Sequence, residues 1–135
     1  MEFDDYRDKY ENIWMERKDG VLTIFFHTQG DSLKWNDVPH RDFGLAFADI
    51  AADQDNKLVI MTGTGDNFCT EWGGNPPVRN TPMDWDPIYR NGKQLLTNLL
   101  NIEVPIIAVI IGPASIHAEI ALLSDIVLMA EEAFL

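Results

Sequence analysis

Two short runs of this sequence, residues 58–63 and 106–111, consist almost wholly of apolar and small residues. They read LVIMTG and IIAVII, without the strict alternation of apolar and polar residues that a half-exposed strand shows. Strands of this kind are buried on both faces, as in parallel sheets that helices cover. The two runs therefore predict an α/β fold with a parallel sheet.

The segments around these runs supply the other expected elements. Residues 13–17 and 21–27 predict two strands, and the KDG between them contains an Asp-Gly pair that favours a tight hairpin turn. Apolar residues at helical spacing predict helices at 36–53, 84–103 and 116–123. The apolar run near the end of the chain predicts a last strand at 125–130.

Capping residues mark the ends of the two long helices. Asn36 or Asp37 is expected to cap the first helix, and Asp84 or Asp86 the second. Pro105 stops the second helix because proline cannot continue a helical hydrogen-bond pattern.

The resulting order of elements is ββαβαβαβ, which predicts parallel strands joined by right-handed crossovers in one domain over residues 1–135. Residues 63–83 are rich in Gly, Pro, Asn and Thr, and they predict a functional loop. The sequence stops directly after the last expected strand. We therefore expect an incomplete domain, truncated at its C-terminal side.

Composition and charge exclude several classes of protein. With 135 residues, 46% of them hydrophobic, the chain can form one domain with a core. Its formal charge of −12 repels phosphate backbones, so we expect no nucleic-acid partner. The single cysteine, Cys69, provides neither an internal disulfide nor a thiolate cluster for zinc. An acidic start and the lack of a long unbroken apolar stretch predict a cytoplasmic protein without membrane contact.

Polar side chains are rare between residues 106 and 127, yet His117 and Glu119 stand there two positions apart. They follow a strand and a Gly-Pro turn, at the edge where open α/β sheets bind ligands. His117 is therefore a candidate functional residue, although a core histidine bonded to a backbone carbonyl fits the same pattern. Glu119 is a second candidate, although the start of a helix favours a carboxylate on electrostatic grounds alone.

Other motifs give weaker signals. TGTGDNF begins like a dinucleotide loop, but Phe68 replaces its third glycine. HAE at 117–119 is half of a zinc-deaminase signature, without the cysteine half. We therefore expect no nucleotide cofactor and no metal. From the local pattern alone, His40 is interpreted as a solvated residue near a helix start and Trp35 as a core or lid aromatic residue.

Three segments together resemble a known family. They are GVLTIFFHTQGDSLKW, NKLVIMTGTGDNFCTEWG and IEVPIIAVIIGPASIHAEIALLSDIVLMAEEAF, and in order and spacing they resemble the N-terminal half of the crotonase (enoyl-CoA hydratase/isomerase) superfamily. The resemblance implies a crotonase-like spiral of ββα units and a homo-trimer or a dimer of trimers. It also implies that two backbone N–H groups, here those of Trp72 and Ile116, stabilise an enolate. Glu119 falls where the hydratases carry a catalytic glutamate.

The chain departs from the common family pattern at both halves of this oxyanion hole, where it has FCTEWG and SIHA. With SLKW, His40 and GPASIHAEIALLSDIVLMAE, it resembles the branch of 6-oxocamphor hydrolases and cyanobacterial β-diketone hydrolases. This branch uses no CoA and hydrolyses a C–C bond of a cyclic 1,3-diketone in a retro-Claisen reaction. The resemblance implies that His117 hydrogen-bonds a substrate carbonyl, with help from Trp35 and His40, and that no cofactor is needed.

Two alternatives stay open. A CoA-dependent hydratase or isomerase would need basic residues near the CoA phosphates, and Lys34, Arg79 and Lys93 are few. A non-catalytic fragment or assembly subunit is the other alternative. It follows from the resemblance, which implies that the water-activating residues of the branch lie beyond residue 135.

Overall fold

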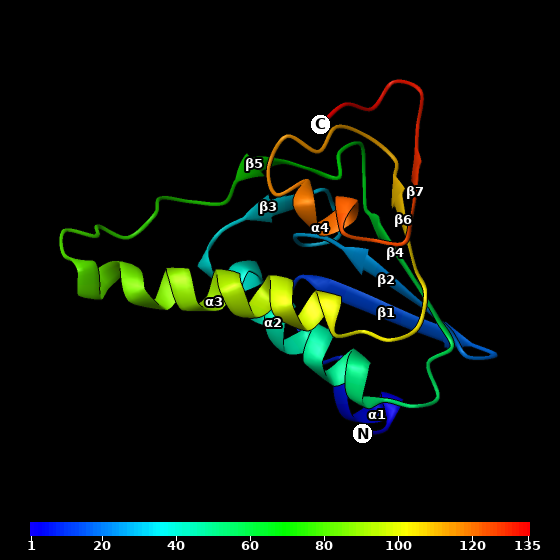
Figure 1. Cartoon of the computed structure of the whole chain (residues 1–135). Helices are drawn as coiled ribbons and strands as arrows, with labels where there is room; N and C mark the ends of the chain where they lie inside the picture. The colour runs from blue at the N-terminus through cyan, green and yellow to red at the C-terminus, as the bar shows by residue number, and fades with distance from the viewer.

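A computed structural model describes all of residues 1–135 and shows a five-stranded sheet with two long helices packed along one of its faces (Figure 1). A second sheet of two short strands lies above the helices in this view. In chain order the elements are α1 (Phe3–Tyr6), β1 (Ile13–Lys18), β2 (Val21–Phe26), β3 (Leu33–Trp35), α2 (Asp37–Ala52), β4 (Leu58–Gly63), β5 (Cys69–Trp72), α3 (Pro82–Leu100), β6 (Ile106–Ile110), α4 (Glu119–Leu122) and β7 (Ile126–Met129).

The hairpin predicted at the start of the chain is confirmed. Strands β1 and β2 pair antiparallel, with Ile13 opposite Phe26 and Lys18 opposite Val21. The turn residues Asp19 and Gly20 have φ angles of 52° and 81°. Positive φ at both positions is the requirement of the tight hairpin turn that Asp-Gly favours.

The predicted parallel sheet is also confirmed. Its strand order is β1-β2-β4-β6-β7, and every pair except β1–β2 is parallel. On one face the side chains of β2, β4 and β6 are fully buried, and Phe26 stacks on Phe43 of α2 at 4.5 Å between ring centroids. On the other face, residues such as Ile60 and Val109 are only half-buried. The expectation of burial on both faces is therefore wrong, because both long helices cover the same face.

A repeating unit of two strands and a helix appears twice, as β2–β3–α2 and as β4–β5–α3. The short strands β3 and β5 of successive units pair in parallel, with Leu33 opposite Cys69 and Trp35 opposite Trp72. The chain thus forms the expected spiral of ββα units. The predicted loop 63–83 is wrong in one part, because β5 lies within it.

The two long helices begin where polar residues cap them. Helix α2 has Asn36 as its N-cap, with its side-chain oxygen accepting from the Val38 N–H. Helix α3 begins at Pro82 with Thr81 as its N-cap, and Asp84 completes a capping box. Neither Asp84 nor Asp86 is the cap, contrary to our expectation, because the helix extends by one more turn toward the N-terminus.

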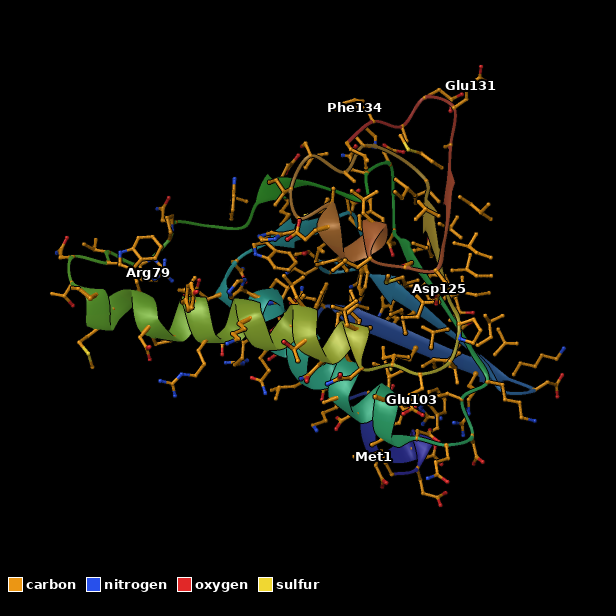
Figure 2. All side chains as sticks on the ribbon, viewed as in Figure 1. Met1, Arg79, Glu103, Asp125, Glu131 and Phe134 are labelled. Carbon is orange, nitrogen blue, oxygen red and sulfur yellow. The ribbon has the colours of Figure 1, made fainter.

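The predicted helix over 116–123 is shorter in the structure, where α4 contains four residues, Glu119–Leu122. His117 has a φ of 53°, a left-handed conformation that a right-handed helix cannot include. The last strand is present as β7, and the Asp125 carboxylate just before it accepts a 2.8 Å hydrogen bond from the Ile106 N–H (Figure 2). This bond ties the start of β7 to the start of β6.

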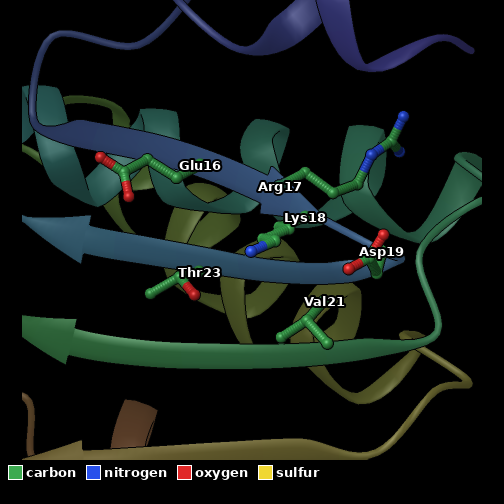
Figure 3. Close-up of a pocket in the computed structure, with 6 residues that line it drawn as sticks. All are labelled: Glu16, Arg17, Lys18, Asp19, Val21 and Thr23. Carbon is green, nitrogen blue, oxygen red and sulfur yellow. The ribbon is translucent and has the colours of Figure 1, made fainter.

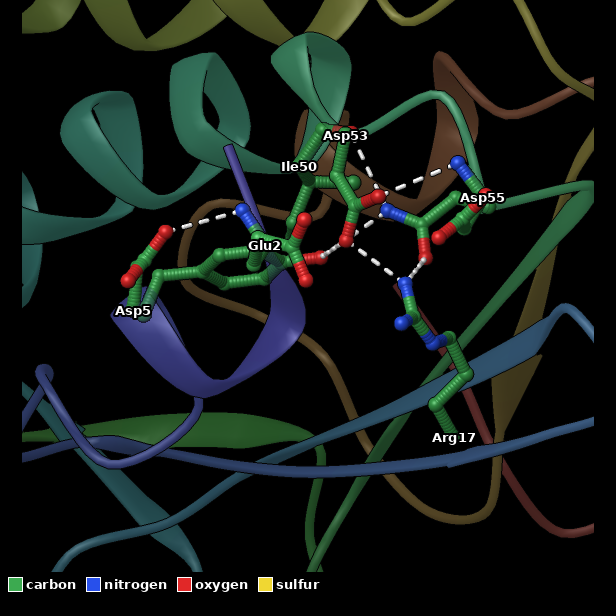
Figure 4. A network of polar contacts seen from close by, with 8 residues as sticks. Glu2, Asp5, Arg17, Ile50, Asp53 and Asp55 are labelled. Atoms are coloured by element: carbon green, nitrogen blue, oxygen red, sulfur yellow. Dashed lines mark hydrogen bonds and ion pairs between the residues drawn. The ribbon is translucent and has the colours of Figure 1, made fainter.

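A buried polar network fastens the N-terminal segment to the end of α2 (Figure 4). The Asp53 carboxylate accepts hydrogen bonds from the Tyr6 hydroxyl at 2.8 Å and from Arg17 at 2.6 Å, and its side chain is 2% exposed. Burial alone would raise the pKa of Asp53, but these bonds, the Asp55 N–H and the Arg17 charge together lower it. Tyr6 is also fully buried.

No helix in the structure is both long and apolar enough to span a membrane.

We predict that Arg17→Met lowers the free energy of unfolding by about 3 kcal/mol at pH 7, because it leaves a buried carboxylate without its cation. The folded-state pKa of Asp53 is depressed, so the wild-type contribution is present above about pH 4 and is lost as the pH falls further. The difference between the two proteins should therefore shrink toward pH 3. Urea unfolding at both pH values measures it.

Arg90→Met is the matched control, because Arg90 forms an ion pair with Asp86 in which both side chains are more than half exposed. Surface pairs of this kind contribute little to stability. Equal midpoints for Arg17→Met and Arg90→Met would contradict the importance of the buried network.

Candidate active site

Six side chains singled out in the sequence analysis lie around one edge of the sheet. Strands β2, β4 and β6 are parallel, so their carboxyl ends, at Phe26, Gly63 and Ile110, meet at the same edge. Open α/β sheets bind ligands at this edge because the loops that leave it can converge. Here the converging segments lead into β3, β5 and α4.

Four aromatic rings from three different segments form a cluster at this edge. Trp35 and His117 lie nearly face to face, with ring centroids 4.1 Å apart and an angle of 31°. His40 meets Trp35 edge-on at 5.9 Å and lies 6.1 Å from His117. Trp72 lies 6.4 Å from His117. The structure thus brings together four of the six predicted site residues through ring contacts.

Trp35 is the floor of this cluster. It ends β3, is only 3% exposed, and packs edge-on against Phe43 of the core at 5.5 Å. Its indole Nε1–H has no hydrogen-bond partner within the protein, yet it is not among the polar atoms that are sealed from solvent. An indole N–H can only donate. Trp35 therefore presents a rigidly held donor to whatever occupies the site.

His40 lies in the first turn of α2, and its ring reaches across to α3. Its Nε2 lies 2.8 Å from the carbonyl oxygen of Ile88, which is 48 positions away in the sequence. A carbonyl oxygen only accepts, so Nε2 carries a proton and the neutral ring keeps its lone pair on Nδ1. Nδ1 has no protein partner and is not sealed from solvent. The expectation of a merely solvated His40 is wrong.

His117 and Glu119 interact directly. Nδ1 of His117 lies 2.6 Å from Oε1 of Glu119, and the two side chains are 28% and 47% exposed. A carboxylate only accepts hydrogen bonds, so Nδ1 of His117 is a donor. The positive φ of His117 turns its side chain back over Trp35. Nε2 of His117 has no partner in the protein and can accept a hydrogen bond in the neutral ring or donate one in the charged ring.

The predicted pair of oxyanion donors is only partly available. The backbone N–H of Gly73 donates to the Trp35 carbonyl at 2.8 Å. Successive backbone N–H groups alternate along a strand, so the backbone N–H of Trp72 points away from β3. The N–H of Ile116, however, donates to the Cys69 carbonyl at 3.1 Å. Ile116 is therefore not a free donor in this conformation. The neighbouring N–H of His117 has no backbone acceptor.

Sequence reasoning missed the part of α3 that holds His40. A Cβ on Gly92 would lie 3.2 Å from Cε1 of His40, so only a glycine leaves the imidazole its full space. In the sequence Gly92 was visible as a glycine inside a helix, a signal that often marks close packing. The Ile88 carbonyl that binds His40 has no signal in the sequence.

The connection from β5 to α3 is fixed by Arg79 (Figure 2). Its guanidinium pairs with Asp37 at the start of α2 and lies 5.3 Å from the ring centre of Trp85. Arg79 is largely buried by these contacts, with a side chain 12% exposed. The connection is thereby held next to the first turn of α2, which carries His40.

Two other features lie outside the ring cluster. A shallow groove runs along Glu16, Arg17, Lys18, Asp19, Val21 and Thr23 (Figure 3). It lies at the hairpin turn, which is the sheet edge opposite the carboxyl ends of β2 and β4. No group of three or more His, Cys, Asp or Glu side chains is arranged to hold a metal ion.

Known proteins share both the sequence pattern and the fold. The family described as enoyl-CoA hydratase/isomerase matches residues 16–135. A β-diketone hydrolase from the cyanobacterium Anabaena sp. PCC 7120, solved with (S)-3-oxocyclohexyl acetic acid, superposes with a TM-score of 0.88 at 39% identity, over 96% of this chain and 52% of that chain. No curated protein sequence matches.

Enoyl-CoA hydratases share the fold at lower identity. One from Mycobacterium avium subsp. paratuberculosis K-10 has a TM-score of 0.74 at 24% identity, over 93% of this chain and 47% of that chain. A probable enoyl-CoA hydratase from Mycobacterium thermoresistibile has a TM-score of 0.78 at 20% identity, over 93% and 51%. The present chain thus spans about half the length of the solved proteins that it matches.

We predict that the thiol of Cys69, under the Ile116 segment, is inert in the folded protein. Burial raises its pKa to about 12, so almost no thiolate is present at pH 8. A thiol-specific disulfide reagent should label it at least a hundredfold more slowly in the native state than in urea. Full labelling of the native protein within seconds would show that the segment over Cys69 opens freely.

Proposed function

The chain belongs to the enoyl-CoA hydratase/isomerase family, and we propose that it forms the carbonyl-binding part of a hydrolase that cleaves a C–C bond of a cyclic 1,3-diketone. The product is a single ring-opened keto acid, formed through an enolate. The observation that carries this proposal is the ring cluster, in which Trp35 Nε1, His40 Nδ1 and His117 Nε2 have no hydrogen-bond partner in the protein and are not sealed from solvent.

The nitrogens of the cluster suit a substrate with carbonyl groups. Trp35 offers a neutral donor, and His117 offers a charged donor when its ring is protonated beside Glu119. Both can donate to a carbonyl oxygen, whose negative charge grows as water adds to the carbon. The ring of Trp72, which is 66% exposed, suits the hydrocarbon ring of a cyclic ketone. The similarity to a β-diketone hydrolase solved with a cyclic keto acid supports this choice of ligand.

The reaction needs two kinds of electrostatic help. Water adds to one carbonyl group, and the resulting oxyanion needs hydrogen-bond donors. The Nε2–H of His117 and the backbone N–H of Trp72 are the proposed donors. The C–C bond then breaks, and its electron pair forms the enolate of the second carbonyl, for which the Trp35 N–H is a suitable donor. Donors that are fixed before the reaction stabilise this charge without reorganising.

A CoA thioester is a less suitable ligand for these residues. Of the three basic residues considered for its phosphates, Lys34 pairs with Glu71 at 3.5 Å and Arg79 pairs with Asp37. Only Lys93 is left, and the overall charge of −12 opposes a polyphosphate. Retention of the chain on an immobilised acyl-CoA would reverse this ranking.

A role as an assembly or binding subunit is favoured by one observation. Strand β7 is at the edge of the sheet, and Ile126, Leu128 and Met129 are 52%, 55% and 44% exposed. An open edge with apolar side chains is a site for association. Sedimentation would then show oligomers, whereas a monomer that unfolds cooperatively would count against this role. The trimeric or hexameric state and the cytoplasmic location stay predictions.

We predict that His117→Ala lowers the rate of diketone hydrolysis by about a hundredfold, because it removes one preorganised donor worth roughly 3 kcal/mol. The assay is conversion of a bicyclic 1,3-diketone to its keto acid, followed by chromatography, with crotonyl-CoA as the competing substrate. Calorimetry with (S)-3-oxocyclohexyl acetic acid measures binding in parallel.

Ser115→Ala is the matched control, since Ser115 is an exposed residue of the same segment. It should bind and react as the wild type does. Unchanged rates in His117→Ala, or hydration of crotonyl-CoA alone, would refute the proposed function.

A further inference from the structure

We propose that Gly92 of α3 is a positioning residue, whose bare backbone lets the His40 imidazole stand in the site with Nε2 on the Ile88 carbonyl. This role rests on the proposed function, in which His40 belongs to the carbonyl-binding cluster. It goes beyond that function, because Gly92 has no side chain with which to contact a ligand and can act only through His40. The geometry that leads to it is a close crossing of α2 and α3.

Helices α2 and α3 come close together at Gly44. A Cβ on Gly44 would lie 3.1 Å from the backbone N of Leu95 and 3.2 Å from its Cα, so the two backbones are nearly in contact there. The side-chain amide of Asn98 on α3 donates to the Gly44 carbonyl at 2.7 Å, and Leu95 is only 3% exposed. The backbone contact keeps the helices from moving closer, while the Asn98 bond and the buried Leu95 side chain resist their separation.

His40 and Gly92 lie one turn away from this contact. His40 is four positions before Gly44 on α2, and therefore lies on the same face of that helix. Gly92 is three positions before Leu95 on α3 and shares its face. The imidazole crosses the gap between the helices, and its Nε2 lies 2.8 Å from the Ile88 carbonyl oxygen. Ile88 precedes Gly92 by four positions, so its carbonyl group points along the helix toward Gly92.

The space beside Gly92 is occupied by this ring. A Cβ at Gly92 would lie 3.2 Å from Cε1 and 3.4 Å from Nε2 of His40, and apart from its own helix backbone and chain neighbours no other heavy atom lies within 4 Å. Because the helix spacing is held at Gly44, an alanine at position 92 is accommodated by movement of the ring. Nε2 is the atom bonded to the Ile88 carbonyl, so this movement disturbs that hydrogen bond.

The consequence for the site follows from the fixed orientation of the ring. His40 is held at Nε2 by α3 and meets Trp35 edge-on at 5.9 Å. Nδ1 is the ring nitrogen that is left for a ligand, since it has no partner in the protein and is not sealed from solvent. A group fixed before binding loses little conformational freedom when the ligand arrives. Displacement of the ring should therefore weaken ligand binding without any change in the residues that contact the ligand.

The first experiment measures the placement of the ring without a ligand. Proton NMR of the wild-type chain should show a nuclear Overhauser effect between Hε1 of His40 and the α-protons of Gly92, because Cε1 lies 3.2 Å from the position of a Cβ there. Absence of this effect would overturn the proposal.

Urea unfolding of Gly92→Ala, His40→Ala and the double variant completes this experiment. In the His40→Ala background, Gly92→Ala should raise the midpoint, because alanine is the better helix former and no side chain stands in its way. With His40 present, the same change should raise the midpoint less or lower it. Equal changes in both backgrounds would show that Gly92 and His40 are not coupled, and would refute the proposal.

The second experiment measures affinity by calorimetry with (S)-3-oxocyclohexyl acetic acid. Gly92→Ala should weaken binding roughly 3- to 10-fold, the value of one net hydrogen bond. The same change in the His40→Ala background should leave the affinity unaltered, because Gly92 reaches the ligand only through His40. Gln94→Ala, at an exposed neighbouring position on α3, is the control and should bind as the wild type does.

The outcomes separate this role from the proposed function. A wild-type chain that does not bind the keto acid refutes the carbonyl site and, with it, the functional role of Gly92, even if the unfolding midpoints are coupled. A wild-type chain that binds, with unchanged affinity in Gly92→Ala or with equal losses in both backgrounds, refutes the role of Gly92 alone. Binding that Gly92→Ala weakens only when His40 is present supports both.

Discussion

The parallel pairing of β2, β4 and β6 is the constraint on which the rest of the structure depends. Parallel strands need a crossover to return the chain to its starting edge, and right-handed crossovers pass over the same face when the strands are added in one direction, as from β2 to β4 to β6. Helices α2 and α3 are therefore packed together on one side of the sheet (Figure 1). The same pairing brings the three carboxyl ends to one edge, and the ring cluster of Trp35, His40, Trp72 and His117 is gathered there.

Much of this architecture could be predicted from local patterns. The Asp-Gly turn, the two apolar runs and the helical spacing of apolar residues gave the hairpin, β4, β6 and both long helices. Strands β3 and β5 could not be found in this way, because they have three and four residues and are stabilised by pairing across 36 to 37 positions of sequence. The left-handed residue that shortens α4 is His117, and no residue-type rule predicts positive φ for a histidine at that position.

The candidate site shows the same division between local and distant information. His117 and Glu119 could be selected because polar residues in an apolar run need an explanation. Their direct contact could not be predicted, because residues two apart in a helix do not face each other and His117 has a left-handed φ. The bond from His40 to the Ile88 carbonyl joins two helices and could not be read from either one. The same holds for Ile116, whose N–H donates to the Cys69 carbonyl only because the segment before α4 meets the start of β5. Backbone donors and acceptors are identical in every residue, so sequence alone does not reveal which of them are occupied.

The ring cluster draws its members from three consecutive turns of the spiral: Trp35 and His40 from the first, Trp72 and the α3 backbone from the second, and His117 from the third. Side chains alternate between the faces of a strand, so a one-residue slip between β3 and β5 would turn Trp35 and Trp72 to opposite sides. A slip would dismantle the site even if the core stayed apolar. The contact between the Trp35 and His117 rings therefore depends on correct register of β3 and β5, and a probe of that contact would also measure how accurately the chain folds.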